Sequence, residues 1–266
     1  MPGIIDFHTH AFPDALAERA MKSLEHGAST KAFLDGRLSS LISSMDRSGI
    51  EKSVVCSIAT RPSQFDPILQ WSKEIRSDRI IPLLSLHPAD TGYAEKLRIT
   101  KEEGFKGIKL HPFYQEFDID DSRMLRMYEI LCKVNLLVAM HTGYDIAFPL
   151  IRRADPAKIL RVSEMFPELK LVTTHLGSWK QWREVEEILA GKPVYMELSF
   201  SMEYLSSEPI KDILLKHPKE YLLFGTDSPW TDQAETLSLF RGLRLGEKIE
   251  TAVLGDSAAR LLESIR

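Results

Sequence analysis

Two histidines separated by one residue follow an apolar run near the start of the sequence. His8 and His10 come directly after Ile4-Ile5-Asp6-Phe7. Because residues i and i+2 of a β-strand point to the same face, both imidazoles would converge on one point. Histidine nitrogen is a common ligand of zinc and related divalent ions, so the pair would supply two ligands of a metal site. Two partly buried structural histidines are the alternative, and this pair alone does not decide between them.

Further polar residues stand where other apolar runs end. Of the eight histidines, five lie at predicted strand ends on the same side of the fold: His8, His10, His111, His141 and His175. His87 also ends a predicted strand. Asp227 follows the last apolar run in the same way. Histidines scattered through a core would not segregate like this, so the pattern indicates a shared site.

The elements that must position these residues repeat along the whole chain. Short apolar, β-branched runs alternate with stretches whose charges have helical spacing, which is typical of βα units. The eight runs are 3–8, 52–58, 80–86, 107–110, 136–140, 170–174, 194–199 and 221–225, and helices are expected at 64–76, 122–133, 158–165 and 180–189. Asp155-Pro156 is a helix-start signal. We therefore predict a single domain over 1–266, an α/β fold of the (β/α)₈ TIM-barrel type, with a doubly wound open sheet as the alternative.

The interval between the first and second strands is longer than the others. About 40 residues separate His10 from the second strand, and 13–26 and 38–48 both have helical patterns. In barrel enzymes the chemistry lies at the carboxyl ends of the strands, where the βα loops gather. We expect an elaborated first βα loop over the barrel mouth, where it would shape a pocket. An extra surface helix without substrate contact is the alternative.

Composition restricts the class of protein. The 266 residues are 44% hydrophobic with a formal charge of -4 and no basic run, which favours a small-molecule substrate over nucleic acid. No apolar stretch approaches the roughly 20 residues of a membrane span, and no signal-peptide pattern opens the sequence, so a cytoplasmic location without membrane contact is expected. Cys56 and Cys132 lie in apolar runs and are expected to pack as free thiols.

Four motifs in order carry a family resemblance. They are His8-Thr9-His10, His141-Thr142-Gly143, His175 and Gly225-Thr226-Asp227-Ser228-Pro229. With them the chain resembles the amidohydrolase superfamily, and in particular amidohydrolase family 2, which contains metal-dependent hydrolases and enzymes like aminocarboxymuconate-semialdehyde decarboxylase. The closing segment 253–262 resembles the last helix of the family, although Asp256 stands where the family usually has Asn. The resemblance covers nearly the whole chain.

The resemblance implies a metal site and two catalytic residues. His8, His10, His141 and Asp227 match the family's ligands of one divalent ion, for which zinc is the first expectation and manganese, iron or cobalt are substitutes. Asp227 would also accept a proton from a metal-activated water and deliver it to the leaving group. His175 matches a position near the metal that polarises a carbonyl or shuttles a proton.

Lys109 has three interpretations. In two-metal members of the superfamily a lysine here is carboxylated and bridges both ions, and His141 and His175 would then bind the second ion. Lys109 could instead remain a cation that binds a substrate carboxylate, or form a structural salt bridge. His111, two residues further on, is a weaker candidate for substrate contact.

Other residues are expected to complete the pocket. Asp6, Glu197 and Ser199 could orient ligating imidazoles, although ordinary hydrogen bonding inside the barrel also accounts for Glu197 and Ser199. Arg61 could bind an acid. Aromatic residues after the strand ends would line the mouth, or else cover the barrel or form an oligomer contact: Phe12, Phe113, Tyr144, Trp179 and Trp230.

The sequence favours one function and leaves two others open. The first is a metal-dependent hydrolase that cleaves an amide, ester or lactone bond of a small organic acid, in a chain that could form a homo-oligomer. The same residues would also serve non-oxidative decarboxylation of a small carboxylic acid, in which the metal binds the carboxylate and a nearby acid protonates the carbon. A barrel that binds a metal or ligand without catalysis is the third hypothesis.

Overall fold

Eight parallel strands form the centre of the molecule. In the computed structural model, which describes residues 3–265, the strands are β1 (Ile4–Thr9), β2 (Ile50–Cys56), β3 (Ile80–Leu83), β4 (Gly107–Leu110), β5 (Leu137–Met140), β6 (Leu171–Thr173), β7 (Tyr195–Glu197) and β8 (Leu222–Leu223). The strands form two sets, β1-β2-β3 and β4-β5-β6-β7-β8, and within each set every strand pairs in parallel with the next. The predicted (β/α)₈ barrel is therefore confirmed.

Backbone hydrogen bonds join these two sets of strands into a closed barrel. Leu84, just beyond β3, donates its amide to the carbonyl of Gly107 (3.1 Å) and accepts from the amide of Lys109 (2.7 Å). On the other side, Phe7 of β1 donates to the carbonyl of Phe224, directly after β8 (2.8 Å). Closure leaves no free sheet edge and brings the first and last strands together.

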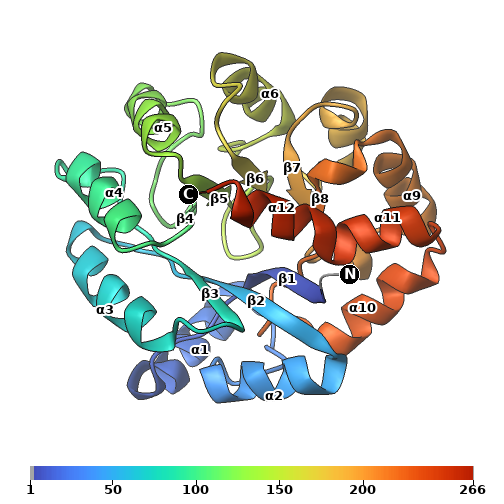
Figure 1. Cartoon of the computed structure of the whole chain (residues 1–266), viewed down its shortest axis with the longest axis horizontal. Helices are drawn as coiled ribbons and strands as arrows, with labels where there is room; N and C mark the ends of the chain where they lie inside the picture. The colour runs from blue at the N-terminus through green and yellow to red at the C-terminus, as the bar shows by residue number, and fades with distance from the viewer. Residues whose placement is uncertain (1–2, 266) are drawn as a thin grey trace.

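Helices surround the barrel, as Figure 1 shows. They are α1 (Asp14–Ala28), α2 (Leu38–Ser48), α3 (Phe65–Ile75), α4 (Tyr93–Glu102), α5 (Ser122–Val134), α6 (Pro156–Met165), α7 (Trp182–Glu184), α8 (Ser201–Tyr204), α9 (Ser207–Lys216), α10 (Gln233–Gly242), α11 (Glu247–Thr251) and α12 (Ser257–Glu263). Every residue of β4 and β5 is buried, because the barrel interior covers one face of each strand and helices cover the other. Apolar β-branched and leucine side chains at these positions make the core.

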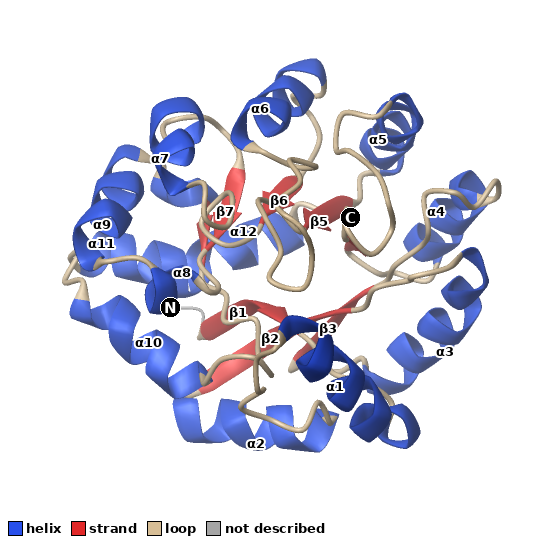
Figure 2. Ribbon diagram, turned by 180° about the vertical axis from the view of Figure 1, so that it is seen from behind, coloured by secondary structure: helices blue, strands red, loops and turns tan. Residues whose placement is uncertain are grey.

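The long first βα connection divides into two parts. Helix α2 packs against β2 and α10 as a member of the outer ring. Helix α1 buries only Ala17, Met21 and Ala28. Other residues of α1 line the same cavity as His8 and His10, so this helix covers part of the barrel mouth, as the sequence predicts. Figure 2 shows α1 on the viewer's side of the barrel, inside the ring of helices.

Cys56 and Cys132 are both free, and Cys56 is buried. Among the helices within residues 3–265, none has the length and apolarity needed to cross a membrane.

Candidate metal centre

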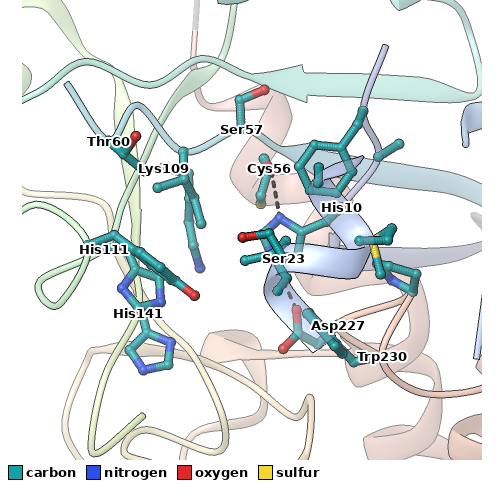
Figure 3. Close-up of a pocket in the computed structure, with 18 of the residues that line it drawn as sticks. His10, Ser23, Cys56, Ser57, Thr60, Lys109, His111, His141, Asp227 and Trp230 are labelled. Atoms are coloured by element: carbon teal, nitrogen blue, oxygen red, sulfur yellow. Dashed lines mark hydrogen bonds and ion pairs between the residues drawn. The ribbon is translucent and has the colours of Figure 1, made fainter. Parts of the chain in front are cut away.

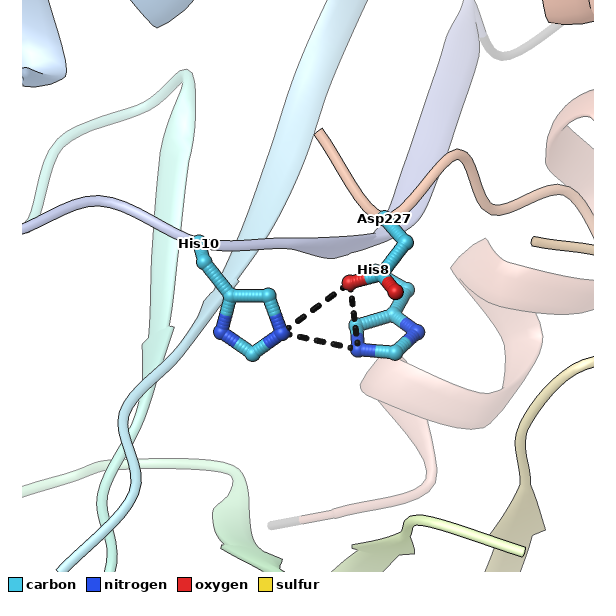
Figure 4. Close-up of side chains that lie close together, drawn as sticks. All are labelled: His8, His10 and Asp227. Atoms are coloured by element: carbon cyan, nitrogen blue, oxygen red, sulfur yellow. Dashed lines mark hydrogen bonds and ion pairs between the residues drawn. The ribbon is translucent and has the colours of Figure 1, made fainter. Parts of the chain in front are cut away.

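Three potential ligand atoms converge where β1 and β8 end. The Nε2 atoms of His8 and His10 are 3.1 Å apart, and Asp227 Oδ1 lies 3.1 Å from His10 Nε2 and 3.4 Å from His8 Nε2 (Figure 4). Bonds of about 2.1 Å that meet at octahedral or tetrahedral angles separate neighbouring ligand atoms by about 3.0–3.4 Å. The spacing of the three atoms therefore fits one shared divalent ion.

Hydrogen bonds on the far side of each ring fix which nitrogen faces this point. His10 Nδ1 lies 2.7 Å from the carbonyl oxygen of Cys56 and must donate to it. His8 Nδ1 lies 2.9 Å from Glu197 Oε1, a carboxylate oxygen that accepts a hydrogen bond from it. In the neutral rings, each Nε2 then carries a lone pair directed toward Asp227 Oδ1, a buried atom without a hydrogen-bond partner among residues 3–265. Three electron-rich atoms facing one another favour a cation between them.

The local electrostatics keep these groups in the forms that bind metals. Burial, and next the positive charge of Lys109, lower the pKa of His8 well below its ordinary value, so its ring is neutral. Burial opposes ionisation of Asp227, but the contacts of its carboxylate with the rings of His8 and His10 outweigh burial and hold the pKa of Asp227 well below its ordinary value. Neutral imidazole and ionised carboxylate are the ligating forms.

Backbone geometry at the end of β8 places Asp227. The residue has a φ of 63°, in the left-handed region that non-glycine residues occupy at a cost, and its amide donates to the carbonyl of His8 (2.7 Å). Asp6 supports this turn, because its carboxylate accepts from Thr226 N (3.0 Å), Thr226 Oγ1 (2.6 Å) and Gln233 Nε2 (2.7 Å). The expectation that Asp6 orients an imidazole is wrong. The carboxylate of Asp6 contacts the backbone amide of His8 but not its ring, and through Thr226 it joins the ends of β1 and β8.

The predicted fourth ligand, His141, lies in a neighbouring group. Its Nδ1 is 3.1 Å from His175 Nε2, its Nε2 is 3.0 Å from the carbonyl of Tyr144, and its ring stacks on that of His111 at 4.0 Å. Asp145, which the sequence analysis missed, lies 3.3 Å from His111 Nε2 and 3.6 Å from His141 Nε2. The structure thus groups His111, His141 and Asp145 apart from the first three ligands. Ligation by His141 stays a prediction.

Glu197 and Ser199, at and just beyond the end of β7, connect the metal centre to His175. Glu197 Oε1 accepts from His8 Nδ1, from the backbone amide of His175 (3.0 Å) and from Ser199 Oγ (2.7 Å). Ser199 Oγ also lies 2.9 Å from His175 Nδ1. One buried carboxylate therefore positions both His8 and His175, which is a role that the sequence pattern only suggested.

Lys109 is a buried cation without an anionic partner. Its side chain is 1% exposed, its Nζ lies 3.2 Å from His8 Nε2, and no carboxylate within residues 3–265 comes within 4.0 Å of it. The salt-bridge interpretation of Lys109 is therefore wrong. Figure 3 shows the side chain extending into the cavity between His10 and His111. Burying an unpaired ammonium is costly, so this position favours an anionic ligand.

A cavity of about 880 Å³ opens above these residues, and its wall includes every residue predicted to bind the metal, contact the substrate or act in catalysis: His8, His10, Arg61, Lys109, His111, His141, His175, Asp227 and Trp230. Arg61 is exposed on it and Trp230 is half-buried. Of the aromatic residues expected at the mouth, Phe12, Trp179 and Trp230 line the cavity. Phe113 and Tyr144 are not part of its wall, and Tyr114, which the sequence analysis missed, takes a place there. Phe113 packs instead beside Phe148.

Comparisons with known proteins agree with this architecture. A family model described as Amidohydrolase matches residues 5–263. No curated protein sequence matched the chain.

Three solved structures illustrate the likeness in fold. An uncharacterised TIM-barrel protein from Bordetella bronchiseptica has 21% identity and a TM-score of 0.83, over 98% of this chain and 99% of that one. A 2,6-dihydroxybenzoate decarboxylase from Rhizobium has 16% identity and a TM-score of 0.71, over 99% of both chains. The 5-carboxyvanillate decarboxylase from Novosphingobium aromaticivorans, in complex with manganese and 4-hydroxy-3-methoxy-5-nitrobenzoic acid, has 14% identity and a TM-score of 0.72, over 98% of this chain and 96% of that one.

Proposed function

The chain belongs to the amidohydrolase family, and from that premise we propose that it is a divalent-metal-dependent decarboxylase of a small aromatic or unsaturated carboxylic acid. One observation carries the proposal. The ligand atoms of His8, His10 and Asp227 and the unpaired ammonium of Lys109 meet in a single cavity. We propose one catalytic domain over 1–266. The cytoplasmic location and the homo-oligomeric state stay predictions.

Decarboxylation is favoured over hydrolysis, which is the first choice from the sequence. The metal-binding residues would serve either reaction. Two of the similar structures, however, are decarboxylases of ring acids. Lys109 supports the same choice, because a buried cation beside the metal ligands suits a substrate that is itself a carboxylate.

The donor set fits a divalent ion held by His8, His10 and Asp227, with His141 as the proposed fourth ligand. A bound ion would supply Lewis acidity that draws electrons from the oxygen atoms of the substrate. Manganese is supported by a relative that binds it, while zinc remains the expectation from two or three imidazoles and a carboxylate. The second ion bridged by a carboxylated Lys109 is not needed, since a free Lys109 has a role.

The remaining residues divide the work of the reaction. Lys109 pairs with the substrate carboxylate and orients it. When the bond between the ring carbon and the carboxyl carbon breaks, carbon dioxide leaves and the electron pair stays on the ring carbon. His175, which lines the cavity, delivers the proton that replaces the carboxyl group. Its hydrogen bond to His141 gives it a route for taking up another proton.

Product analysis tests the proposal directly. The manganese-loaded and zinc-loaded proteins are incubated with hydroxybenzoates labelled with carbon-13 in the carboxyl group, and separately with aryl esters and lactones. We expect labelled carbon dioxide from at least one hydroxybenzoate. A new carboxylate from an ester or lactone, with no carbon dioxide from any acid, would establish hydrolysis instead.

Matched variants connect the reaction to the site. Asp227→Asn should lower turnover by at least about 100-fold, because the ion would lose a direct ligand and even the loss of a residue that supports a ligand costs about 10- to 100-fold. Asp212→Asn makes the same chemical change on the exposed surface of α9 and should leave turnover unchanged. Metal content is measured for both proteins. Full turnover of the Asp227 variant would remove this residue from the mechanism.

A further inference from the structure

The cavity is larger than the proposed reaction requires. Its volume of about 880 Å³ lies in the upper part of the range of about 300–1,000 Å³ that encloses drug-sized ligands. A single-ring acid held at Lys109 would leave much of that space to water. The extra space is not polar, because it lies between two helices whose cavity-facing side chains are mostly aliphatic or aromatic.

Helix α1 forms one wall of this outer space. Leu16, Ala20 and Leu24 recur every four residues, so they share one face of the helix, and all three line the cavity. The side chains that α1 buries are Ala17, Met21 and Ala28, and of these Met21 and Ala28 also contribute to the cavity wall. Leu16 is 43% exposed although it is fully apolar. The protein therefore covers this face of α1 only in part, and an apolar ligand in the cavity would cover more of it.

Helix α3 forms part of the wall as well. Ile68 and Trp71 line the cavity, whereas Phe65, Leu69 and Ser72 are the residues that α3 buries. Ile68 and Trp71 lie on the side of the helix next to its buried face and are themselves only partly buried. Aliphatic side chains of α1 and the indole of Trp71 thus provide an apolar lining continuous with the space above the metal centre.

The charges of the lining fit an acid whose other end is apolar. Arg19 and Arg61 are exposed on the cavity wall, and no carboxylate within residues 3–265 lies within 4.0 Å of either. Such unpaired cations attract an anionic substrate toward the opening. Lys109 is the buried cation further inside.

We propose that the substrate is amphipathic, with a carboxylate that binds at Lys109 and the metal centre and an apolar arm that lies between α1 and α3. This inference rests on the proposed function, because it assumes that the acid end is the reacting end. It adds a substrate class: a ring acid with an alkyl or aryl substituent, rather than a bare hydroxybenzoate.

Binding measurements test the arm without depending on turnover. Benzoate and 4-butylbenzoate are titrated calorimetrically into the manganese-loaded protein. Each fully buried methylene contributes at most about fourfold in affinity, so partial burial of the butyl arm should tighten binding by at least about tenfold. Equal affinity for the two acids, or no binding of either, would overturn the proposal.

A matched pair of variants locates the arm. Ala20→Phe fills the outer space from α1, whereas Ala15→Phe adds the same ring on the exposed face of α1, away from the cavity. In Ala20→Phe the advantage of 4-butylbenzoate should fall below about twofold while benzoate binds as in the wild type, because only the arm loses its place. Ala15→Phe should keep the full advantage. An advantage that survives in Ala20→Phe would mean that the arm binds elsewhere.

A second pair keeps the test valid if Ala20→Phe folds poorly. Leu16→Ser removes part of the apolar wall at an exposed position, and Leu239→Ser makes the same change at an exposed position of α10. Only Leu16→Ser should reduce the advantage of the butyl arm, by about threefold or more. An equal advantage in both variants would contradict the inference.

Release of carbon dioxide from single-ring acids is measured separately. The absence of an apolar binding site for the arm is thereby distinguished from the absence of the proposed reaction.

Discussion

At the scale of single residues, the partner of each imidazole decides what that imidazole can do. His8 directs Nε2 toward Asp227 because Glu197 holds the proton on the opposite nitrogen. Glu197 also accepts hydrogen bonds from the backbone amide of His175 and the hydroxyl of Ser199, so its carboxylate is held from several sides. Such an arrangement restricts the ring of His8 to one orientation and one tautomer, and it raises the basicity of the ligating nitrogen.

Glu197→Gln should weaken manganese binding by about 10- to 100-fold, the range known for residues that support a ligating histidine. The amide can still accept a hydrogen bond from His8, but it lacks the negative charge. Titration of the metal-free protein with Mn²⁺, followed by calorimetry or electron paramagnetic resonance, measures the change. Glu247→Gln, at an exposed position in α11, is the control. If both variants bind manganese as the wild type does, Glu197 does not position His8.

The sequence predicts those site residues whose positions are fixed by a strand. His8, His10, Lys109 and Asp227 all lie at or just beyond strand ends, and parallel strands bring such positions together. Asp145 lies in the connection after β5 and reaches His111 only because that loop turns back over the barrel mouth. Nothing in residue type or spacing encodes such a loop path, which is why the group around Asp145 was missed.

At the scale of elements, the residue patterns locate all eight strands and several of the helices, but they place the ends of these elements unevenly. The stretch 38–48 matches α2 at both ends, and the stretch 122–133 matches α5 within one residue. The last strand was expected over 221–225 but spans only Leu222–Leu223, because the chain leaves the regular strand geometry to form the turn that carries Asp227. The stretch 180–189 was expected as one helix and is the short α7 followed by a π turn at Val185–Leu189. Apolar runs indicate burial, but regular pairing ends earlier than the run.

The start of α6 shows a local signal that does fix an element. Asp155 is the N-cap, its carboxylate accepts from the amides of Ala157 (3.1 Å) and Lys158 (3.3 Å), and Pro156 occupies the first helical position. Asp155→Ala should lower the free energy of unfolding by about 1 kcal/mol, because two amides lose their acceptor. Asp155→Asn should keep most of the stability, since its side-chain oxygen can cap in the same way. Urea unfolding of both variants measures this, and an equal loss in both would attribute the effect to the charge of Asp155 rather than to its capping bond.

At the scale of the whole molecule, the candidate metal centre lies on the seam that closes the barrel. The amide of Asp227 donates to His8, the amide of His10 donates to the carbonyl of Ser228 (2.6 Å), and Asp6 binds Thr226 and Gln233. The ligands therefore come from segments more than 200 residues apart in sequence, His8 and His10 on one side and Asp227 on the other. An ion shared by them would bridge the first and last strands, so that metal binding and barrel closure are coupled.

Manganese should therefore raise the melting temperature of the protein. A ligand that binds only the folded state stabilises it by about 2.7 kcal/mol at 100 times its dissociation constant, which for a chain of this size corresponds to a shift of about 5–10 °C. Differential scanning calorimetry of the metal-free protein, with and without Mn²⁺, measures the shift. Asp212→Asn should show the same increase, whereas Asp227→Asn should show little, because it retains the folded barrel but loses the carboxylate that joins the two ends. If the Asp227 variant is stabilised as much as the wild type, manganese binds elsewhere and the seam between β1 and β8 is closed by its hydrogen bonds alone.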